Sequence, residues 1–112
     1  DASAHALLAQ GYNQAGDSSA AAREYGRAIE LSAGGAALFT AYGNVLARLD
    51  RLDDALEQYD DAIAQDPAYA LAHFNRGSAL KLLGRDPEAG EAFGRASALD
   101  PELADAADLL RR

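Results

Sequence analysis

An internal repeat of 34 residues constrains this chain more than any other feature of its sequence. When the sequence is shifted against itself by that interval, small and large residues fall on one another without a single insertion. Such a period is typical of proteins in which helical units stack, because no unit buries its apolar face alone. The aligned positions are His5, Phe39 and His73; Ala9, Gly43 and Gly77; Tyr12, Leu46 and Leu80; Ala21, Ala55 and Ala89; Tyr25, Tyr59 and Phe93; and Ala28, Ala62 and Ala96.

Each repeat is predicted to form two helices. Apolar residues recur at helical spacing, as at Ala55 and Tyr59. Pro67 and Pro101 end two of the repeats, because the residue before a proline is disfavoured in the α region. The expected first helices span about 2–15, 36–49 and 70–83, and the expected second helices span about 18–31, 52–65 and 87–99.

Two glycines in the middle of first helices predict close packing. Gly43 and Gly77 each cost about 0.5–1 kcal/mol relative to alanine in a helix. A close approach of the partner helix would offset that cost. An aromatic residue at Tyr25, Tyr59 or Phe93 is then expected to fill the gap toward the next unit.

The composition excludes several classes of partner. Of the 112 residues, 49% are hydrophobic and 25% are charged, which is typical of a folded globular domain. The net charge of -8 makes nucleic acid and anionic membranes poor partners, and no apolar run is long enough to span a bilayer. We expect a cytoplasmic protein, with the periplasm left open. Because the chain begins at Asp1, we also expect it to be a piece of a longer protein.

The aligned positions identify a family. The order of Gly43, Leu46, Ala55, Tyr59, Ala62 and Pro67 recurs 34 residues later and, less completely, 34 residues earlier. This pattern resembles the tetratricopeptide repeat family over residues 2–101, and "FNRGSALKLLGR" resembles its bacterial variety. The resemblance implies an all-α, right-handed solenoid in one domain, with three helix-turn-helix units at about 2–35, 36–69 and 70–103. Where the family has a tryptophan, this chain has His5, Phe39 and His73.

The last segment, residues 102–112, has two interpretations. Its apolar stripe includes Leu103, Ala107 and Leu110, and the family often closes with a capping helix of this kind. Ala107 and Leu110 also keep the register of the repeat, as the opening of a fourth unit would. Both interpretations stay open at the level of the sequence.

No constellation of residues predicts chemistry. The chain has no cysteine, and His5 and His73 lie two repeats apart without a histidine four residues away from either. The acidic run that includes Asp53 and Asp61 has no glycine-turned loop to organise metal ligands, so we interpret it as a solvated helix face. We interpret the histidines as packing residues. We therefore expect no catalytic, cofactor or metal site, and a protein that is not an enzyme.

The distribution of acidic residues points to a binding face. The three expected first helices contain no Asp or Glu, where an even scatter of the 18 acidic residues would place about seven. In the family these helices line a concave groove, so the groove is expected to be neutral to basic inside an acidic shell. Amides there would pair with a ligand's backbone, Arg48 and Lys81 with a carboxylate, and Leu71 and Phe74 with an apolar side chain. The candidate groove residues are Gln10, Asn13, Asn44, Arg48, Leu71, Phe74, Asn75, Ser78 and Lys81.

We expect the function to be a scaffold-like protein–protein interaction module that binds a peptide or partner segment in this groove. Family members that bind chaperone tails use a clamp of basic residues and asparagines. The matching positions here are Ala6, Gln10, Ala41, Leu71 and Asn75, which argues against a chaperone tail as the ligand. Two alternatives are a substrate-presenting arm of a larger bacterial enzyme, such as a glycosyltransferase, and a structural element that self-associates.

Overall fold

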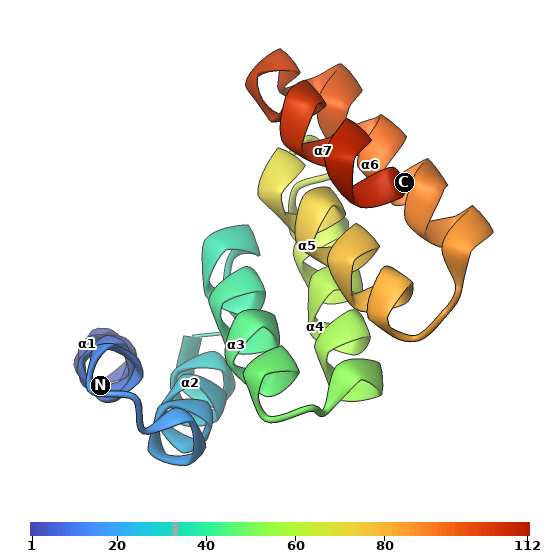
Figure 1. Cartoon of the computed structure of the whole chain (residues 1–112). Coiled ribbons are helices and arrows are strands. Elements are labelled where there is room, and N and C mark those ends of the chain that lie inside the picture. The colour runs from blue at the N-terminus through green and yellow to red at the C-terminus, as the bar shows by residue number, and fades with distance from the viewer. Residues whose placement is uncertain (33) are drawn as a thin grey trace.

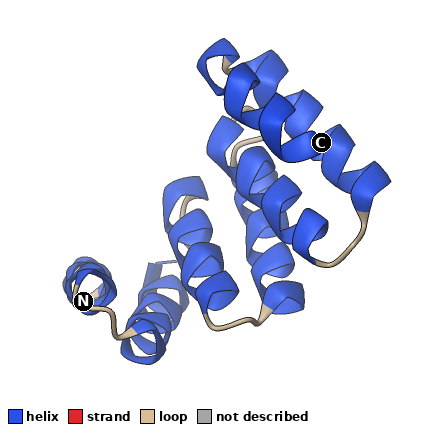
Figure 2. Ribbon diagram, viewed as in Figure 1, coloured by secondary structure: helices blue, strands red, loops and turns tan. Residues whose placement is uncertain are grey.

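The computed structural model describes residues 1–32 and 34–112, and its regular structure in these residues is helical (Figure 1, Figure 2). Ala33, which falls inside the first expected unit, lies outside the described residues. The elements are α1 Ala2–Gln14, α2 Ser18–Ser32, α3 Ala36–Arg48, α4 Leu52–Gln65, α5 Ala70–Leu82, α6 Asp86–Leu99, a short 3-10 helix Pro101–Leu103, and α7 Ala104–Arg111. The six helices expected from the repeat are confirmed, each to within one residue at either end.

The helices form successive antiparallel pairs that stack into a curved array. α1 packs with α2, α3 with α4, and α5 with α6, while α7 follows against α6 and α5 (Figure 1). The predicted all-α solenoid is therefore confirmed. Among the described residues, no helix combines the length and the apolar character needed to cross a bilayer.

The turn inside each pair is the same structure repeated at the same register. Gly16, Asp50 and Gly84 all adopt a positive φ, of 85°, 61° and 77°. In each turn, the next backbone N–H donates over 2.9 Å to the carbonyl of the residue five positions before it. This arrangement closes the end of a helix by satisfying a carbonyl that has no partner within the helix. Asp50 takes the left-handed conformation that glycine adopts in the other two turns, which aspartate tolerates better than most residues.

The close approach expected at Gly43 and Gly77 is confirmed, and the ring that fills the space belongs to the same helix pair, α3–α4 or α5–α6, rather than to a gap toward the next unit. Tyr59 and Phe93 are buried. A Cβ atom added to Gly43 would lie 2.6 Å from the Tyr59 ring, and one added to Gly77 would lie 2.9 Å from the Phe93 ring. Real Cβ atoms do not approach ring carbons so closely, so these two positions accept only glycine unless the rings move. The backbone cost of a glycine inside a helix is thus offset by the packing of an aromatic ring.

The two histidines make polar contacts as well as packing contacts. His5 Nδ1 lies 2.5 Å from Glu24 Oε2, which joins α1 to α2. Glu24 is only 6% exposed, and Arg27 Nη1 donates to its other oxygen over 3.1 Å. His73 Nε2 lies 2.9 Å from the carbonyl oxygen of Pro67, which joins α5 to the loop before it. Their prediction as simple packing residues therefore omitted the hydrogen bonds that these side chains make.

The contact between His5 and Glu24 predicts a pH-dependent stability. The hydrogen bond from His5 is the main cause that holds the pKa of the Glu24 carboxyl below its usual range. A carboxyl whose pKa is lowered on folding stabilises the fold above its unfolded pKa, and that contribution is lost as the pH falls through the folded value. We expect Glu24→Gln to melt at a lower temperature than the wild type at pH 7, and the gap to close as the pH falls below about 4.5. A gap that stays constant from pH 7 to pH 3 in thermal melts would show that Glu24 acts through packing alone.

Candidate binding groove

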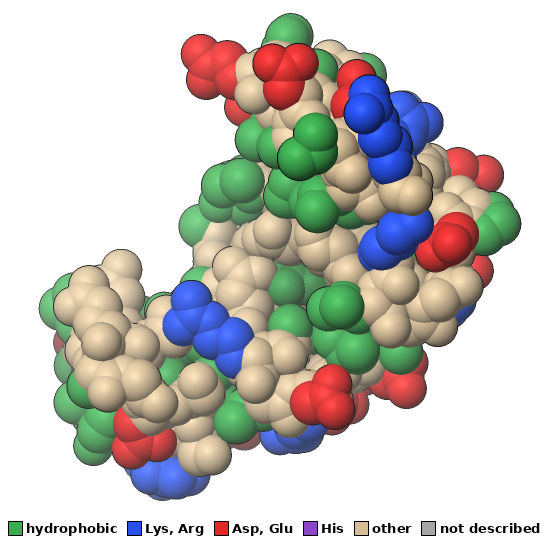
Figure 3. All heavy atoms as spheres, viewed as in Figure 1, with side chains coloured by type: hydrophobic (Ala, Val, Ile, Leu, Met, Phe, Trp, Pro, Cys, Tyr) green, Lys and Arg blue, Asp and Glu red, His purple; other side chains and the backbone are tan. Residues whose placement is uncertain are grey.

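The curved array has a hollow face lined by α1, α3 and α5. Figure 3 shows this hollow between α1 on one side and α5 with α7 on the other. Three cavities of about 240 to 260 Å³ follow one another along it. The α1–α3 cavity is lined by Ala6, Leu7, Gln10, Tyr25, Ala37, Leu38 and Ala41; the α3–α5 cavity by Asn44, Ala47, Arg48, Tyr59, Asn75, Ser78, Ala79 and Leu82; and the α5–α7 cavity by Ser78, Lys81, Leu82, Phe93 and Leu110.

A hydrogen-bonded cluster of amides forms the floor of the α3–α5 cavity. The Oδ1 atom of Asn44 accepts from the Tyr59 hydroxyl over 2.7 Å and from Asn75 Nδ2 over 3.0 Å. Burial raises the pKa of Tyr59 to about 12, so its hydroxyl stays protonated and able to donate at neutral pH. Because two donors converge on one oxygen, the orientation of the Asn44 amide is fixed. Its two N–H groups have no partner among residues 1–32 and 34–112, and they remain available to a ligand.

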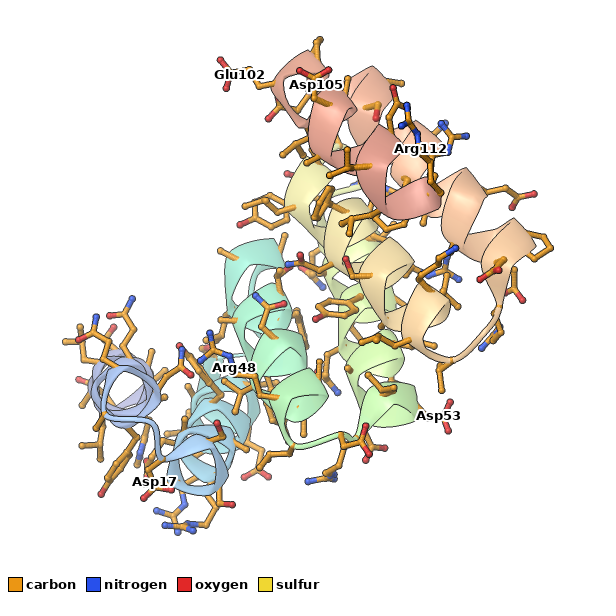
Figure 4. All side chains as sticks on the ribbon, in the orientation of Figure 1. Asp17, Arg48, Asp53, Glu102, Asp105 and Arg112 are labelled. Atoms are coloured by element: carbon orange, nitrogen blue, oxygen red, sulfur yellow. The ribbon has the colours of Figure 1, made fainter. Side chains whose placement is uncertain are left out.

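Arg48 is the cation that this face leaves without a carboxylate. Its Nη1 atom donates to Asn13 Oδ1 over 2.6 Å, from α3 to α1 (Figure 4). Among the described residues, no ion pair involves Arg48, whereas Arg76 binds Asp60 over 2.8 Å and Lys81 lies 3.6 Å from Asp86. Arg48 therefore presents N–H groups and a full charge that no carboxylate neutralises.

The structure brings most of the candidate groove residues together, in three places. Asn44, Arg48, Asn75 and Ser78 meet at the α3–α5 cavity, and Asn13 joins them through Arg48. Gln10 lines the α1–α3 cavity, while Lys81 lines the α5–α7 cavity.

Leu71 and Phe74 line none of these three cavities. Leu71 is exposed, and the half-buried Phe74 ring packs edge-to-face on Phe93, with ring centroids 5.5 Å apart. Within the described residues, the Phe74 ring is therefore committed to the packing of α5 on α6.

The electrostatic character of the hollow follows from where the acids lie. α1, α3 and α5 contain no Asp or Glu, and none lines the three cavities. Figure 3 shows acidic side chains at the outer margins of this view, while the hollow carries apolar and neutral atoms with Lys and Arg at its edges. Since charges beyond about 8 Å are largely screened at physiological salt, a ligand in the hollow responds to this local field more than to the net charge.

The apolar lining of the three cavities comes from residues outside the candidate set. Leu7, Leu82 and Leu110 line these cavities, and the rings of Tyr25 and Tyr59 reach them from the second helices. Leu82 carried a usable signal, because it lies four residues after Ser78 on the same helix face. The apolar stripe of α7 was noted, but was interpreted as a cap or as the opening of a fourth unit rather than as part of the groove.

No cluster of metal-binding side chains occurs in the described residues. Within residues 1–32 and 34–112, no three His, Asp or Glu side chains gather at metal-binding distance. The His5–Glu24 contact joins α1 to α2 and lies outside the three cavities. Within the part of the chain that the structure describes, the hollow presents hydrogen-bond donors, the guanidinium group of Arg48 and apolar surface.

Comparison with known proteins identifies the repeat. A family described as "TPR repeat" matches residues 43–84. The "Small glutamine-rich tetratricopeptide repeat-containing protein 2" of Mycosarcoma maydis is 32% identical over 102 residues, which cover 89% of this chain and 29% of that protein. The chain thus spans less than a third of this curated relative. The bacterial variety and the count of three units stay predictions.

Solved structures share the fold over nearly the whole chain. The "TPR2B-domain:pHsp70-complex of yeast Sti1" has a TM-score of 0.93 at 23% identity, covering 98% of this chain and 92% of that one. The "First TPR of Spaghetti (RPAP3) bound to HSP90 peptide SRMEEVD" has a TM-score of 0.92 at 24% identity, covering 98% and 87%. At this level of identity the likeness establishes a common architecture.

Proposed function

Because this chain is a tetratricopeptide repeat protein, we propose that it is a non-enzymatic interaction module that binds an extended peptide, or an extended segment of a partner protein, along α1, α3 and α5. The observation that carries the proposal is the acid-free hollow with three consecutive cavities. Two solved domains of the same architecture are described as bound to Hsp70 and HSP90 peptides, which is consistent with this use of the fold.

The polar floor of the hollow suits a ligand rich in acceptors. The oxygens of Asn13 and Asn44 are occupied by internal donors, whereas N–H groups of Asn44 and Arg48 are free for a ligand within the described residues. Backbone carbonyls supply acceptors whatever the sequence of the peptide, and a carboxylate matches the guanidinium of Arg48. We therefore propose that the groove prefers an acidic side chain or a C-terminal carboxylate at the α3–α5 cavity.

The neighbouring cavity offers no second cation. Ala6, Gln10 and Ala41 line the α1–α3 cavity, at positions where the resemblance implies clamp residues in members that bind chaperone tails. A carboxylate placed there would lose water and gain no charged partner. The proposed acidic contact is therefore confined to Arg48, and the α1–α3 cavity accommodates small or apolar parts of the ligand.

Reversing the charge at Arg48 tests this proposal. We expect Arg48→Glu to weaken the binding of acidic peptides by at least about fivefold, because a partly exposed charge contact contributes about 1 kcal/mol. Fluorescence anisotropy with labelled acidic, neutral and basic peptides at two salt concentrations measures the effect, and the acidic preference should shrink at high salt. When Lys81→Glu is added to this variant, the further loss of affinity should be smaller than the loss caused by Arg48→Glu, because Lys81 already faces Asp86.

Arg95→Glu is the matched control. Arg95 is exposed on α6, lines none of the three cavities, and its replacement changes the net charge by the same amount. Arg95→Glu should bind like the wild type. A wild-type preference for basic peptides, or an equal loss in both variants, would contradict a groove centred on Arg48.

A further inference from the structure

We propose that α7 forms one wall of the binding site, and that the α5–α7 cavity binds a bulky apolar side chain of the same peptide whose acidic group contacts Arg48. This inference rests on the proposed function and specifies the ligand: an acidic group and a bulky apolar residue, separated by a defined distance along an extended chain.

The α5–α7 cavity is built for an apolar side chain. Its floor is the fully buried ring of Phe93, and its rim is formed by Leu82 and Leu110, which are 73% and 43% exposed. Ser78 does not make it polar, since its hydroxyl lies 3.4 Å from the Phe74 carbonyl within α5. An occupant with an apolar side chain would cover Leu82 and Leu110 without leaving a polar group unpaired.

The repeat itself places the charged and the apolar subsites one step apart. Gln14, Arg48 and Leu82 occupy the same register position of α1, α3 and α5. The same place on successive helices is therefore neutral, cationic and apolar in turn. Leu82 and Ser78 line both the α3–α5 and the α5–α7 cavities, so the two cavities are contiguous. One ligand can occupy both without crossing an intervening wall.

This step sets the spacing within the ligand. Packed helices lie about 8–10 Å apart, and an extended peptide rises about 3.3 Å per residue. Neighbouring cavities are therefore roughly three residues apart along the peptide. The inferred motif is an acidic residue or C-terminal carboxylate with a leucine, isoleucine, phenylalanine or methionine about three positions away, the apolar residue lying toward α7.

Charge favours an acidic peptide over a second copy of this chain as the occupant. Lys81 lines the α5–α7 cavity, and Arg48 lines the neighbouring α3–α5 cavity. The chain carries a net charge of -8, which opposes the close approach of another copy. A short acidic peptide carries far less charge than a second copy, so it meets less repulsion and responds mainly to the nearby cations.

A set of short labelled peptides tests the motif. In the first peptide one aspartate and one leucine are three positions apart in a background of alanine and serine, and a second peptide has the order reversed. In their controls the leucine is replaced by alanine or is moved to six positions from the aspartate. We expect the better of the two orders to bind the wild type about tenfold more tightly than its alanine control, since a buried leucine side chain outweighs alanine by about that factor.

Variants of α7 and α5 locate the contact. Leu110→Ser and Leu82→Ser should each abolish most of the leucine advantage, measured in each variant as the ratio of its affinities for the leucine peptide and for the alanine control. Leu109→Ser is the matched control, because Leu109 is 70% exposed on the same helix and lines none of the three cavities. It should retain the full advantage. Thermal melts of all three variants show whether α7 still packs. If Leu110→Ser loosens α7, then Leu82→Ser, which changes a residue of α5, provides the test of the apolar contact.

The possible failures are distinguishable. If leucine and alanine peptides bind the wild type equally well, the inference is overturned while groove binding stands. If the leucine advantage persists in both Leu110→Ser and Leu82→Ser, the apolar contact lies elsewhere and the inference is likewise overturned. If no acidic peptide binds at all, the proposed function itself fails. Sedimentation that showed a dimer abolished by Leu110→Ser would assign the cavity to a second copy and overturn the inference.

Discussion

Replacing Tyr59 by alanine is expected to lower the free energy of unfolding by about 3–5 kcal/mol. The Tyr59 ring is 2% exposed and packs against Gly43 so closely that no Cβ fits between them. Its removal leaves a cavity between α3 and α4 and strips Asn44 of one of its two donors. Single domains are stable by only about 5–15 kcal/mol, so the loss is a large part of the total. Urea denaturation followed by circular dichroism measures it.

Tyr59→Phe separates the ring from its hydroxyl. This variant keeps the packing and loses the hydrogen bond to Asn44, which contributes about 1 kcal/mol. It also frees the Asn44 amide to rotate, so the loss of binding free energy for a peptide should exceed the loss of unfolding free energy.

A loss of unfolding free energy below about 1 kcal/mol for Tyr59→Ala would show that the ring is not the packing element described above.

Two glycines in helices should respond in opposite directions to alanine. Gly43→Ala places a Cβ atom 2.6 Å from a buried ring, and overpacking of this kind costs about 1–3 kcal/mol. Gly90, in α6, has nothing within 4 Å of an added Cβ. Gly90→Ala should therefore stabilise the protein by about 0.5–1 kcal/mol, the ordinary gain of alanine over glycine in a helix.

The pair of variants carries its own control, because both make the same substitution inside a helix. Thermal and urea denaturation of the two proteins, measured together, give the difference directly. If Gly43→Ala gained stability as Gly90→Ala does, the Tyr59 ring would have to move without cost. The close approach would then not be the reason for glycine at this register position.

Local structure was open to prediction because its determinants lie close together in the sequence. Helix ends follow from residues at the ends themselves, such as Gly84 in the left-handed turn and Pro101 after α6. Exact repetition of the spacing then made the stacking of helix pairs predictable. It also made a close approach at Gly43 and Gly77 predictable, whereas the structure showed that each glycine contacts the aromatic residue 16 positions later in its own repeat.

The binding face depended on contacts between side chains from different repeats. Arg48 and Arg76 are both cations in first helices, yet Arg76 binds Asp60 on α4 while Arg48 reaches Asn13 on α1. The two arginines stand at different register positions of the repeat and so on different helix faces, but the side chain that each one meets is supplied by another helix. The half-buried Phe74 likewise packs edge-to-face on Phe93 of the neighbouring helix, a contact that its own local sequence does not specify.

The sequence by itself determined the helices, their turns, the stacking of the pairs and the absence of acids from α1, α3 and α5. Each of these follows from residues within one repeat or from the period that links repeats. Only the tertiary structure decided which amide oxygens are occupied, which cation is free, and that Leu110 of α7 closes a cavity over Phe93. These depend on distances between residues about 30 positions apart or more, or on helices brought together by packing, which no local pattern specifies.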